Sequence, residues 1–198
     1  MYHEVRRAYS ERASEYIAAL GSVEDMDPLD VALITGWGAG VAGPILDAGS
    51  GPGHWTGLLH GLGCDVRGLD MVPEFIESAR QRFPHVTFKA GDLLDMPFTS
   101  SNFGGVLAWY SLIHVRPEDR GRALREFARV LKPKGTLLVG AFFGAQDIPF
   151  DHAITEAFYW SEKGLATHLE SAGFQVISID TRCPQSGRSH LVALGRLI

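Results

Sequence analysis

A glycine-rich segment and the acid that follows it are the residues of this chain best suited to hold a ligand. Residues 49–53 read Gly-Ser-Gly-Pro-Gly, after the apolar run 45–48 and before a helix-like stretch that opens at His54. Glycine lets a ligand approach the backbone and adopts positive φ angles freely, and the first N–H groups of a helix are open to a ligand. Asp70 ends the next apolar run, and its carboxylate can accept two hydrogen bonds from a ribose diol. The pattern predicts a nucleoside site at the carboxyl ends of parallel strands.

The spacing of the glycines indicates which kind of nucleoside is bound. A dinucleotide fingerprint has the form G-x-G-x-x-G, whose third glycine lets helix and strand pack closely around a pyrophosphate. Here His54 occupies that sixth position, the pattern is G-x-G-x-G, and Asp47 stands just before it. The sequence therefore disfavours a nicotinamide-dependent oxidoreductase, which stays open as the alternative enzyme. A tight strand-to-helix turn without a ligand is the structural alternative.

The composition is that of an ordinary globular protein. The 198 residues fit one domain, 1–198, with N-terminal helices in 1–43 and a sheet core in 44–198. A net charge of −5 with scattered basic residues gives no surface for nucleic acid. No apolar stretch approaches the roughly 20 residues that span a bilayer, and the N-terminus lacks a signal-peptide core, so we expect a cytoplasmic protein without a membrane partner. Cys64 and Cys183 lack the spacing of a redox or zinc motif, and we expect no metal and a monomer or homodimer.

Alternating helix and strand patterns define the expected elements. Apolar residues at three- and four-residue steps predict one amphipathic helix from Val5 to Leu20. Asp27 and Pro28 provide the N-cap and first turn of a second helix, which should end at Gly36 and lead into a connector at 36–43. Strands are expected at 45–48, 65–70, 86–90, 103–109, 136–143, 174–181 and 190–195. Further helices are expected after His54, at 71–83, at 118–131 and after Ser161, with a less regular, aromatic-rich segment at 144–160.

The order of these elements predicts the fold class. Only a polar stretch at 182–189 separates the last two strands, so they should pair as an antiparallel hairpin. The other strands alternate with helices, and right-handed crossovers then place helices on both faces of the sheet. We therefore expect an α/β fold with a doubly wound, mostly parallel, Rossmann-like sheet of seven strands, in which an antiparallel terminal strand joins the far edge.

In this order and spacing, several segments resemble the class I, or seven-strand, S-adenosylmethionine-dependent methyltransferases. The resemblance covers essentially Tyr9 to Arg196 and is carried by Leu46–Gly53, Leu69-Asp70, Gly91-Asp92, the strand through Trp109, and Arg129–Gly135. Tyr9 and Tyr16 before the first strand, with Leu112-Ile113-His114 after the fourth, look like the branch that methylates small molecules. Residues 109–112 lack the Asn/Asp-Pro-Pro-aromatic tetrapeptide of the amino-methylating nucleic-acid enzymes.

The resemblance implies how S-adenosylmethionine, with S-adenosylhomocysteine as its product, would be held. The loop glycines would let the backbone approach the methionine part of the cofactor. Asp70 would accept from both ribose hydroxyls, and Met71 would lie against the adenine. Asp47 is expected to order the loop by accepting its N–H groups more than to touch the ligand. The full predicted set is Tyr9, Tyr16, Asp47, Gly49, Ser50, Gly51, Gly53, Asp70, Met71, Asp92, Leu93 and Trp109.

The remaining contacts implied by the resemblance have structural alternatives. Asp92 would accept from the adenine amino group while the Leu93 N–H reaches a ring nitrogen, but Asp92 could also be a helix N-cap. The Trp109 carbonyl would face the ammonium group of the cofactor. Tyr9 and Tyr16 would belong to an N-terminal helical lid that excludes water, although their seven-residue spacing also fits one buried helix face.

The resemblance implies methyl transfer to an oxygen, nitrogen or carbon atom of a small-molecule acceptor. The sulfonium is already a strong electrophile, so the protein must mainly align the nucleophile and exclude water. A general base is needed only for a protonated acceptor; His114 is the first candidate and His152 the second, with packed scaffold as the alternative role of His114. We expect the acceptor pocket to be built from His114, the lid and 144–160, with Phe150 as a wall and Arg116 available for an acidic group. A non-catalytic S-adenosylmethionine-binding module is the alternative outside enzymes.

Overall fold

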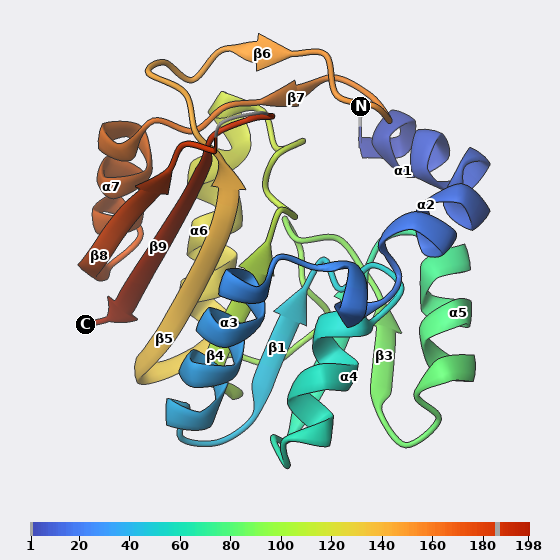
Figure 1. Cartoon of the computed structure of the whole chain (residues 1–198). Coiled ribbons are helices and arrows are strands. Elements are labelled where there is room, and N and C mark those ends of the chain that lie inside the picture. Colours follow the sequence, from blue (N-terminus) through green and yellow to red (C-terminus); the bar gives the residue numbers. More distant parts are fainter. Residues whose placement is uncertain (1, 185–186) are drawn as a thin grey trace.

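A single seven-stranded sheet organises the chain. The computed structural model describes residues 2–184 and 187–198. The strand order is β3-β2-β1-β4-β5-β9-β8 (Figure 1), and β9 runs antiparallel to the other strands of this sheet. The strands are β1 Ile45–Ala48, β2 Val66–Asp70, β3 Thr87–Ala90, β4 Phe103–Trp109, β5 Leu131–Phe142, β8 Phe174–Arg182 and β9 His190–Leu197. The predicted fold class is confirmed.

The place of the antiparallel strand differs from the prediction. β9 lies between β5 and β8, so the edge strand is β8, which runs parallel to β5. After β5 the chain passes through α7 to β8, which leaves one strand position between itself and β5. The chain then turns back, and β9 fills the position between β5 and β8 as a hairpin with β8. Within the polar stretch that precedes β9, residues 185–186 lie outside the described part of the chain.

Helices cover both faces of the sheet. Figure 1 shows α3 and α4 in front of it and α6 and α7 behind it, while α5 packs on β2 and β3. The helices are α1 Tyr2–Glu11, α2 Ala13–Leu20, α3 Pro28–Gly40, α4 His54–Gly61, α5 Pro73–Arg82, α6 Pro117–Val130 and α7 Glu162–Ser171, with a short 3-10 helix η1 at Val23–Asp25. In the described residues, none of these helices has the length and apolar character to cross a membrane.

The N-terminal segment is two helices rather than the one that the sequence predicts. The break falls at Arg12, which has φ −116° and ψ 16°. Its guanidinium hydrogen-bonds the Ala153 carbonyl, a contact made across 141 positions of sequence. The bend also lets Tyr9 and Tyr16 converge on Phe75, with ring centroids 5.9 and 5.1 Å from it. Tertiary contacts therefore override the helical periodicity here.

Helix α3 begins as predicted but ends later. The Asp27 carboxylate accepts from the Leu29 N–H at 2.8 Å, which confirms the N-cap. The helix then continues to Gly40 instead of ending at Gly36. A Cβ at Gly38 would lie 2.4 Å from Leu59 Cδ2, so this glycine allows α3 to pack tightly on α4. That packing offsets a cost of about 1 kcal/mol for a glycine within a helix.

Two later segments also differ from the prediction. β5 starts at Leu131 rather than at 136, because Leu131 already pairs with Phe103 before the register shifts. The segment 144–160 contains a small two-stranded ladder, formed by β6 at Pro149–Phe150 and β7 at Ala157–Phe158. This ladder crosses above the main sheet in Figure 1.

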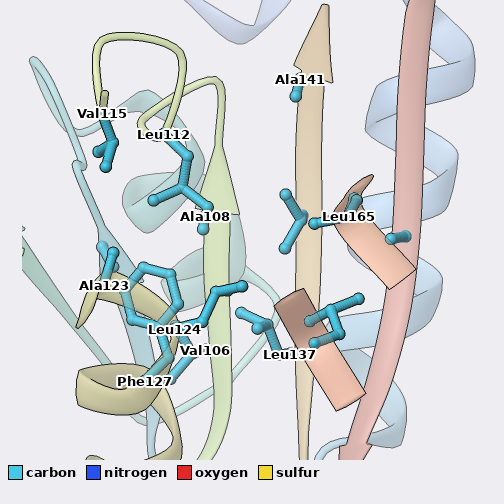
Figure 2. Close-up of a cluster of buried hydrophobic side chains, with 14 of the residues drawn as sticks. Val106, Ala108, Leu112, Val115, Ala123, Leu124, Phe127, Leu137, Ala141 and Leu165 are labelled. Atoms are coloured by element: carbon cyan, nitrogen blue, oxygen red, sulfur yellow. The ribbon is translucent and has the colours of Figure 1, made fainter. Parts of the chain in front are cut away.

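The largest hydrophobic cluster lies between the sheet and the helices behind it. Figure 2 shows Val106 of β4 against Leu124 and Phe127 of α6, and the same cluster includes Leu137 of β5 and Leu165 of α7. All of these side chains are fully buried, and each such burial stabilises the fold by about 1.5–3 kcal/mol. The cluster fixes the central strands, and their carboxyl ends carry the site.

Candidate functional site

Two adjoining cavities lie over the carboxyl ends of the strands. The strand-end cavity, of about 110 Å³, is lined mainly by residues that follow β1, β2, β3 and β4. The aromatic cavity, of about 560 Å³, is lined by α2, the end of β5, residues 152–154 and the start of β9. The residues that line both are Tyr9, Tyr16, Gly49, Gly51, Trp109 and Tyr110. The cavities are therefore two ends of one cleft.

Two glycines of the loop after β1 form the floor of this cleft. Gly49 has φ +85°, and a Cβ there would lie 2.2 Å from Ser111 Cβ. Gly51 has φ +53° and open space where a side chain would be. Its N–H donates to Asp70 Oδ2 at 2.8 Å. The backbone of the loop is thus exposed to a ligand, as predicted from the glycine pattern.

Other residues of the loop have different surroundings from those expected. A Cβ at Gly53 would lie 2.9 Å from the Phe88 ring, so this glycine serves the packing of α4 and does not line the cleft. Asp47 is buried beneath the loop, where its carboxylate accepts from Thr56 Oγ1 at 2.6 Å. Burial raises the pKa of Asp47 to about 7. The prediction that Asp47 accepts the loop N–H groups is wrong, because Asp70 accepts the loop N–H of Gly51 instead.

Asp70 is held rigidly at the end of β2. Its Oδ1 accepts from the Val72 N–H and its Oδ2 from the Gly51 N–H, each at 2.8 Å. Burial raises its pKa to about 6, although these backbone bonds favour the ionised form. The Met71 N–H also favours the ionised form of Asp70. Because a carboxylate has about four acceptor positions, Asp70 keeps acceptor capacity for a ligand in the strand-end cavity that it lines.

The acid after β3 lies in the same cavity. Asp92 Oδ1 accepts from the Leu94 N–H at 2.9 Å, within a turn over residues 92–95 rather than at a helix start. The helix N-cap alternative for Asp92 is therefore wrong. Leu93 and Met71 also line this cavity. The site thus combines two acids with apolar walls, as an adenosine group would require.

A tyrosine and a histidine meet at the boundary of the two cavities. Tyr9 OH lies 2.9 Å from His114 Nε2, and His114 Nδ1 lies 2.8 Å from the Glu156 carbonyl. A carbonyl only accepts, so Nδ1 carries the imidazole proton and Nε2 accepts from the tyrosine hydroxyl. Burial lowers the pKa of His114 and raises that of Tyr9. His114 is therefore a neutral base at pH 7, with Tyr9 bonded to its basic nitrogen.

Tyr9 and Tyr16 are packed in a hydrophobic cluster and also border the cleft. They pack edge to face, with ring centroids 5.6 Å apart, against the small cluster around Phe75. They also line both cavities. Burial raises the pKa of Tyr16 to about 12, so both phenols keep their protons.

The aromatic cavity only partly matches the predicted acceptor pocket. The His152 ring lies 5.2 Å from that of His114 and lines the cavity, and burial lowers its pKa to about 4. Phe150 does not line it, because its ring stacks on Tyr159 at 4.3 Å, behind Phe142. Arg116 also lies outside the lining and is partly exposed. The wall that the sequence assigned to Phe150 is formed by Phe142.

Sequence reasoning missed further residues of this cavity. His190 and Phe142 face it because β9 starts where β5 ends, with Phe142 paired to His190 in the ladder. The expected hairpin contained this signal, since the first residue of an antiparallel strand lies at the carboxyl edge of the parallel strands. Trp55 and His54, at the start of α4, also line the cavity. Burial lowers the pKa of His54 to about 4.

Buried polar atoms without a partner indicate that the cleft suits a polar ligand. In residues 2–184 and 187–198, these include Ser50 Oγ and His54 Nδ1 at the aromatic cavity and Ser111 Oγ beside Gly49. Leaving such a group unpaired costs about 1–3 kcal/mol. A ligand with its own donors and acceptors in this cleft would offset that cost.

Comparison with known proteins adds a family match. Residues 45–135 match the family model described as "Methyltransferase domain". The O-methyltransferase cnsE of Penicillium expansum is 31% identical over 148 residues, covering 68% of this chain and 53% of that protein. A demethylmenaquinone methyltransferase of Chlorobaculum parvum is 35% identical over 92 residues, covering 46% of this chain and 37% of that protein. The chain therefore spans about half the length, or less, of these two relatives.

Solved structures share the fold. The 1,6-didemethyltoxoflavin-N1-methyltransferase of Burkholderia thailandensis, solved with 1,6-didemethyltoxoflavin and S-adenosylhomocysteine, has a TM-score of 0.76 to this chain. It is 23% identical, and the match covers 98% of this chain and 89% of that one. At this identity the likeness shows the fold alone.

Proposed function

The chain belongs to the class I S-adenosylmethionine-dependent methyltransferases, and from this we propose that it transfers the methyl group of S-adenosylmethionine to an oxygen, nitrogen or carbon atom of a small molecule. The observation that carries the proposal is the arrangement of Gly51 and Asp70 at the strand ends. A rigid carboxylate there retains free acceptor positions beside exposed loop backbone. The family match favours this reaction over a nicotinamide-dependent oxidation.

The residues present fit the cofactor, and we propose the following contacts. The carboxylate of Asp70 accepts from the ribose hydroxyls, and that of Asp92 accepts from the adenine amino group. Met71 and Leu93 supply the apolar walls of the adenine site. The backbone at Gly49 and Gly51 and the unpartnered hydroxyls of Ser50 and Ser111 accommodate the amino-acid part, as does the Trp109 carbonyl. Asp47 and Gly53 support the loop from behind.

When bound, S-adenosylmethionine supplies a methyl group on a positively charged sulfur, which keeps the electron pair of the broken C–S bond. The protein contributes alignment of the acceptor and exclusion of water. Tyr9 and Tyr16 form the part of the N-terminal helices that closes over the boundary between the cavities. Arg12 fastens these helices to the opposite wall through the Ala153 carbonyl.

Tyr9 and His114 provide a route for the proton of a protonated acceptor. Tyr9 lines both cavities, whereas His114 lines only the strand-end cavity. An acceptor in the aromatic cavity therefore gives its proton to the Tyr9 oxygen while the Tyr9 proton moves to His114 Nε2. The Glu156 carbonyl holds the ring by its Nδ1–H throughout. The imidazolium then returns its proton to water.

Net charge, cysteine state and sheet continuity bear on the class of acceptor, the compartment and the domain organisation. The net charge of −5 favours a small-molecule acceptor over nucleic acid. Cys64 and Cys183 are free thiols, which suits a reducing cytoplasm. One sheet runs through the chain, and we propose a single domain, 1–198, that acts as a monomer or homodimer.

Calorimetry with separate ligands tests the proposal. S-adenosylhomocysteine should bind with micromolar affinity, and NAD should not bind. The reverse result would refute the methyltransferase assignment. Transfer of labelled methyl groups to extract components then separates an enzyme from a non-catalytic binding module.

A further inference from the structure

Six rings form a continuous arc along one wall of the cleft. In order, the ring arc is Tyr9, His114, His152, Phe142, His190 and Tyr110. Successive ring centroids lie 5.4, 5.2, 6.2, 5.9 and 5.8 Å apart. All of these rings except His114 line the aromatic cavity. Its volume of about 560 Å³ falls within the range of small-molecule sites, about 300–1,000 Å³.

The arc has a polar pair at each end. At one end, Tyr9 is hydrogen-bonded to His114. At the other, the Tyr110 hydroxyl is hydrogen-bonded to His190 Nδ1. In the described part of the chain this is the only hydrogen bond of the His190 side chain, so its Nε2 is left for a ligand. The apolar ring of Phe142 lies between the two pairs and packs directly on the second one, with its centroid 5.9 Å from that of His190 and 4.9 Å from that of Tyr110.

Tyr110 is held in an unusual conformation to reach this position. Its φ is +53°, which non-glycine residues seldom adopt. Such strain costs of order 1–3 kcal/mol and is concentrated at functional sites. The Tyr110 N–H is fixed by the Gly140 carbonyl at 2.8 Å. The fold thus accepts strain at a residue that orients His190.

The charged side chains of the aromatic cavity are all engaged by others. Among the described lining residues, Arg12 pairs with Glu15 at 2.9 Å, and Asp30 pairs with Arg182. Burial lowers the pKa of His152 and of His190, so these rings are uncharged at pH 7. The Arg188 guanidinium lies 5.8 Å from the centre of the Phe142 ring and donates to the Asp151 carbonyl, but it is not part of the lining. A charged acceptor would therefore lose its hydration without a free opposite charge on the cavity wall, which is costly.

We propose that the acceptor is an uncharged planar phenol that lies along the ring arc, with the hydroxyl that is methylated at Tyr9 and a second polar group hydrogen-bonded to His190. This inference rests on the proposed function and makes it narrower. Aromatic rings on the cavity wall match a flat apolar body, and the polar ends match two separated polar groups. His190 is then a specificity-determining residue that takes no part in the chemistry.

Binding of three probes to the full chain saturated with S-adenosylhomocysteine tests the proposal. The probes are 4-phenylphenol, 4,4′-dihydroxybiphenyl and biphenyl-4,4′-dicarboxylate, measured by calorimetry at pH 7. The diol should bind about tenfold more tightly than the monophenol, and the dicarboxylate should not bind. Equal or undetectable binding of all three probes, or preferred binding of the dicarboxylate, would overturn the inference.

Variants assign the preference to His190. His190→Phe should abolish the tenfold advantage of the diol, and His190→Gln, which keeps an N–H donor, should restore part of it. Tyr110→Phe, which frees the imidazole, should weaken diol binding as well. His60→Phe, the same change at an exposed position on α4, serves as the control and should leave the advantage intact.

The outcomes separate this inference from the proposed function. If S-adenosylhomocysteine itself fails to bind the unaltered protein, the proposed function fails and the inference fails with it. If S-adenosylhomocysteine binds but His190→Phe and Tyr110→Phe both keep the full preference for the diol, only the role of His190 is refuted.

Discussion

Replacing Asp70 by alanine should weaken the binding of S-adenosylhomocysteine by about 2–3 kcal/mol, which lies within the range of about 1.5–3 kcal/mol for hydrogen bonds to a charged group. That loss corresponds to roughly a 30- to 140-fold rise in Kd. The carboxylate is buried and fixed by backbone N–H groups, so it is already oriented at the end of β2 before a ligand binds. Calorimetry of S-adenosylhomocysteine binding measures the effect directly.

The same substitution also affects folding, because Asp70 accepts from Gly51 and Val72. Removing the carboxylate leaves these donors unpaired, and a buried unpaired donor costs about 1–3 kcal/mol. Urea denaturation must therefore accompany the binding measurement. Asp70→Asn retains one oxygen acceptor and should lose less stability than Asp70→Ala, while binding of S-adenosylhomocysteine remains weakened.

Asp47→Asn is the matched control for Asp70. Asp47 is also a buried acid of a neighbouring strand, but its partner is Thr56 and it does not line the cleft. We expect a change in stability with a Kd within threefold of the original. A folded Asp70→Ala protein with an unchanged Kd would show that Asp70 is only a strand terminus.

Three further predictions follow from the cleft and its buried acids. Tyr9→Phe should lower the rate of methyl transfer to a phenolic acceptor by about 10²- to 10⁴-fold, the usual contribution of acid–base catalysis. His114→Ala should lower this rate as well, and both variants should bind the cofactor with a Kd within threefold of the original. Unchanged rates in both variants would refute the proton route. Phe142→Ala should reduce the rate of methyl transfer, whereas Phe150→Ala should have a much smaller effect because Phe150 does not line the cavity. If Phe150→Ala reduced the rate more than Phe142→Ala, the acceptor would have to bind elsewhere. Burial raises the pKa of Asp47 from 3.8 to about 7, so between these values the folded state holds a proton that the unfolded state has released, and the contribution of this group to stability is lost as pH rises. When the pH is raised from 5 to 8, the free energy of unfolding of the Asp47→Asn variant should therefore fall less than that of the original protein, as measured by urea titrations at each pH. An identical fall in both proteins would contradict the assigned pKa.

Much of the framework could be predicted because local sequence determines it. The all-apolar β4 is buried along its whole length, and glycines at positive φ follow β1. Asp70 at the end of β2 and Asp92 after β3 both line the strand-end cavity. Each of these features depends on a residue and its immediate neighbours, or on strands that must lie in parallel.

The errors arose where distant contacts decide the structure. Helix α1 ends before Arg12 because that side chain reaches Ala153, far along the chain. Helix α3 passes through its glycines because Gly38 allows contact with Leu59. The loop acid was misassigned because spacing alone does not say whether Asp47 points toward the loop or toward Thr56. None of these partners can be identified from the periodicity of a single segment.

The strand-end cavity depends mainly on local sequence, whereas the aromatic cavity depends on contacts between distant segments, and this difference affects specificity for the acceptor. The strand-end cavity takes most of its lining from residues at or just after the ends of β1 to β4, so the parallel strands themselves bring these residues together. The aromatic cavity depends on Phe142, His152 and His190, which come from three segments joined by the β5–β9 ladder and by the chain before β7. Substitutions at these three positions change one wall without touching Asp70 or the glycine loop. The acceptor can therefore change while cofactor binding is kept, which is the physical basis for measuring the two properties separately in every variant proposed above.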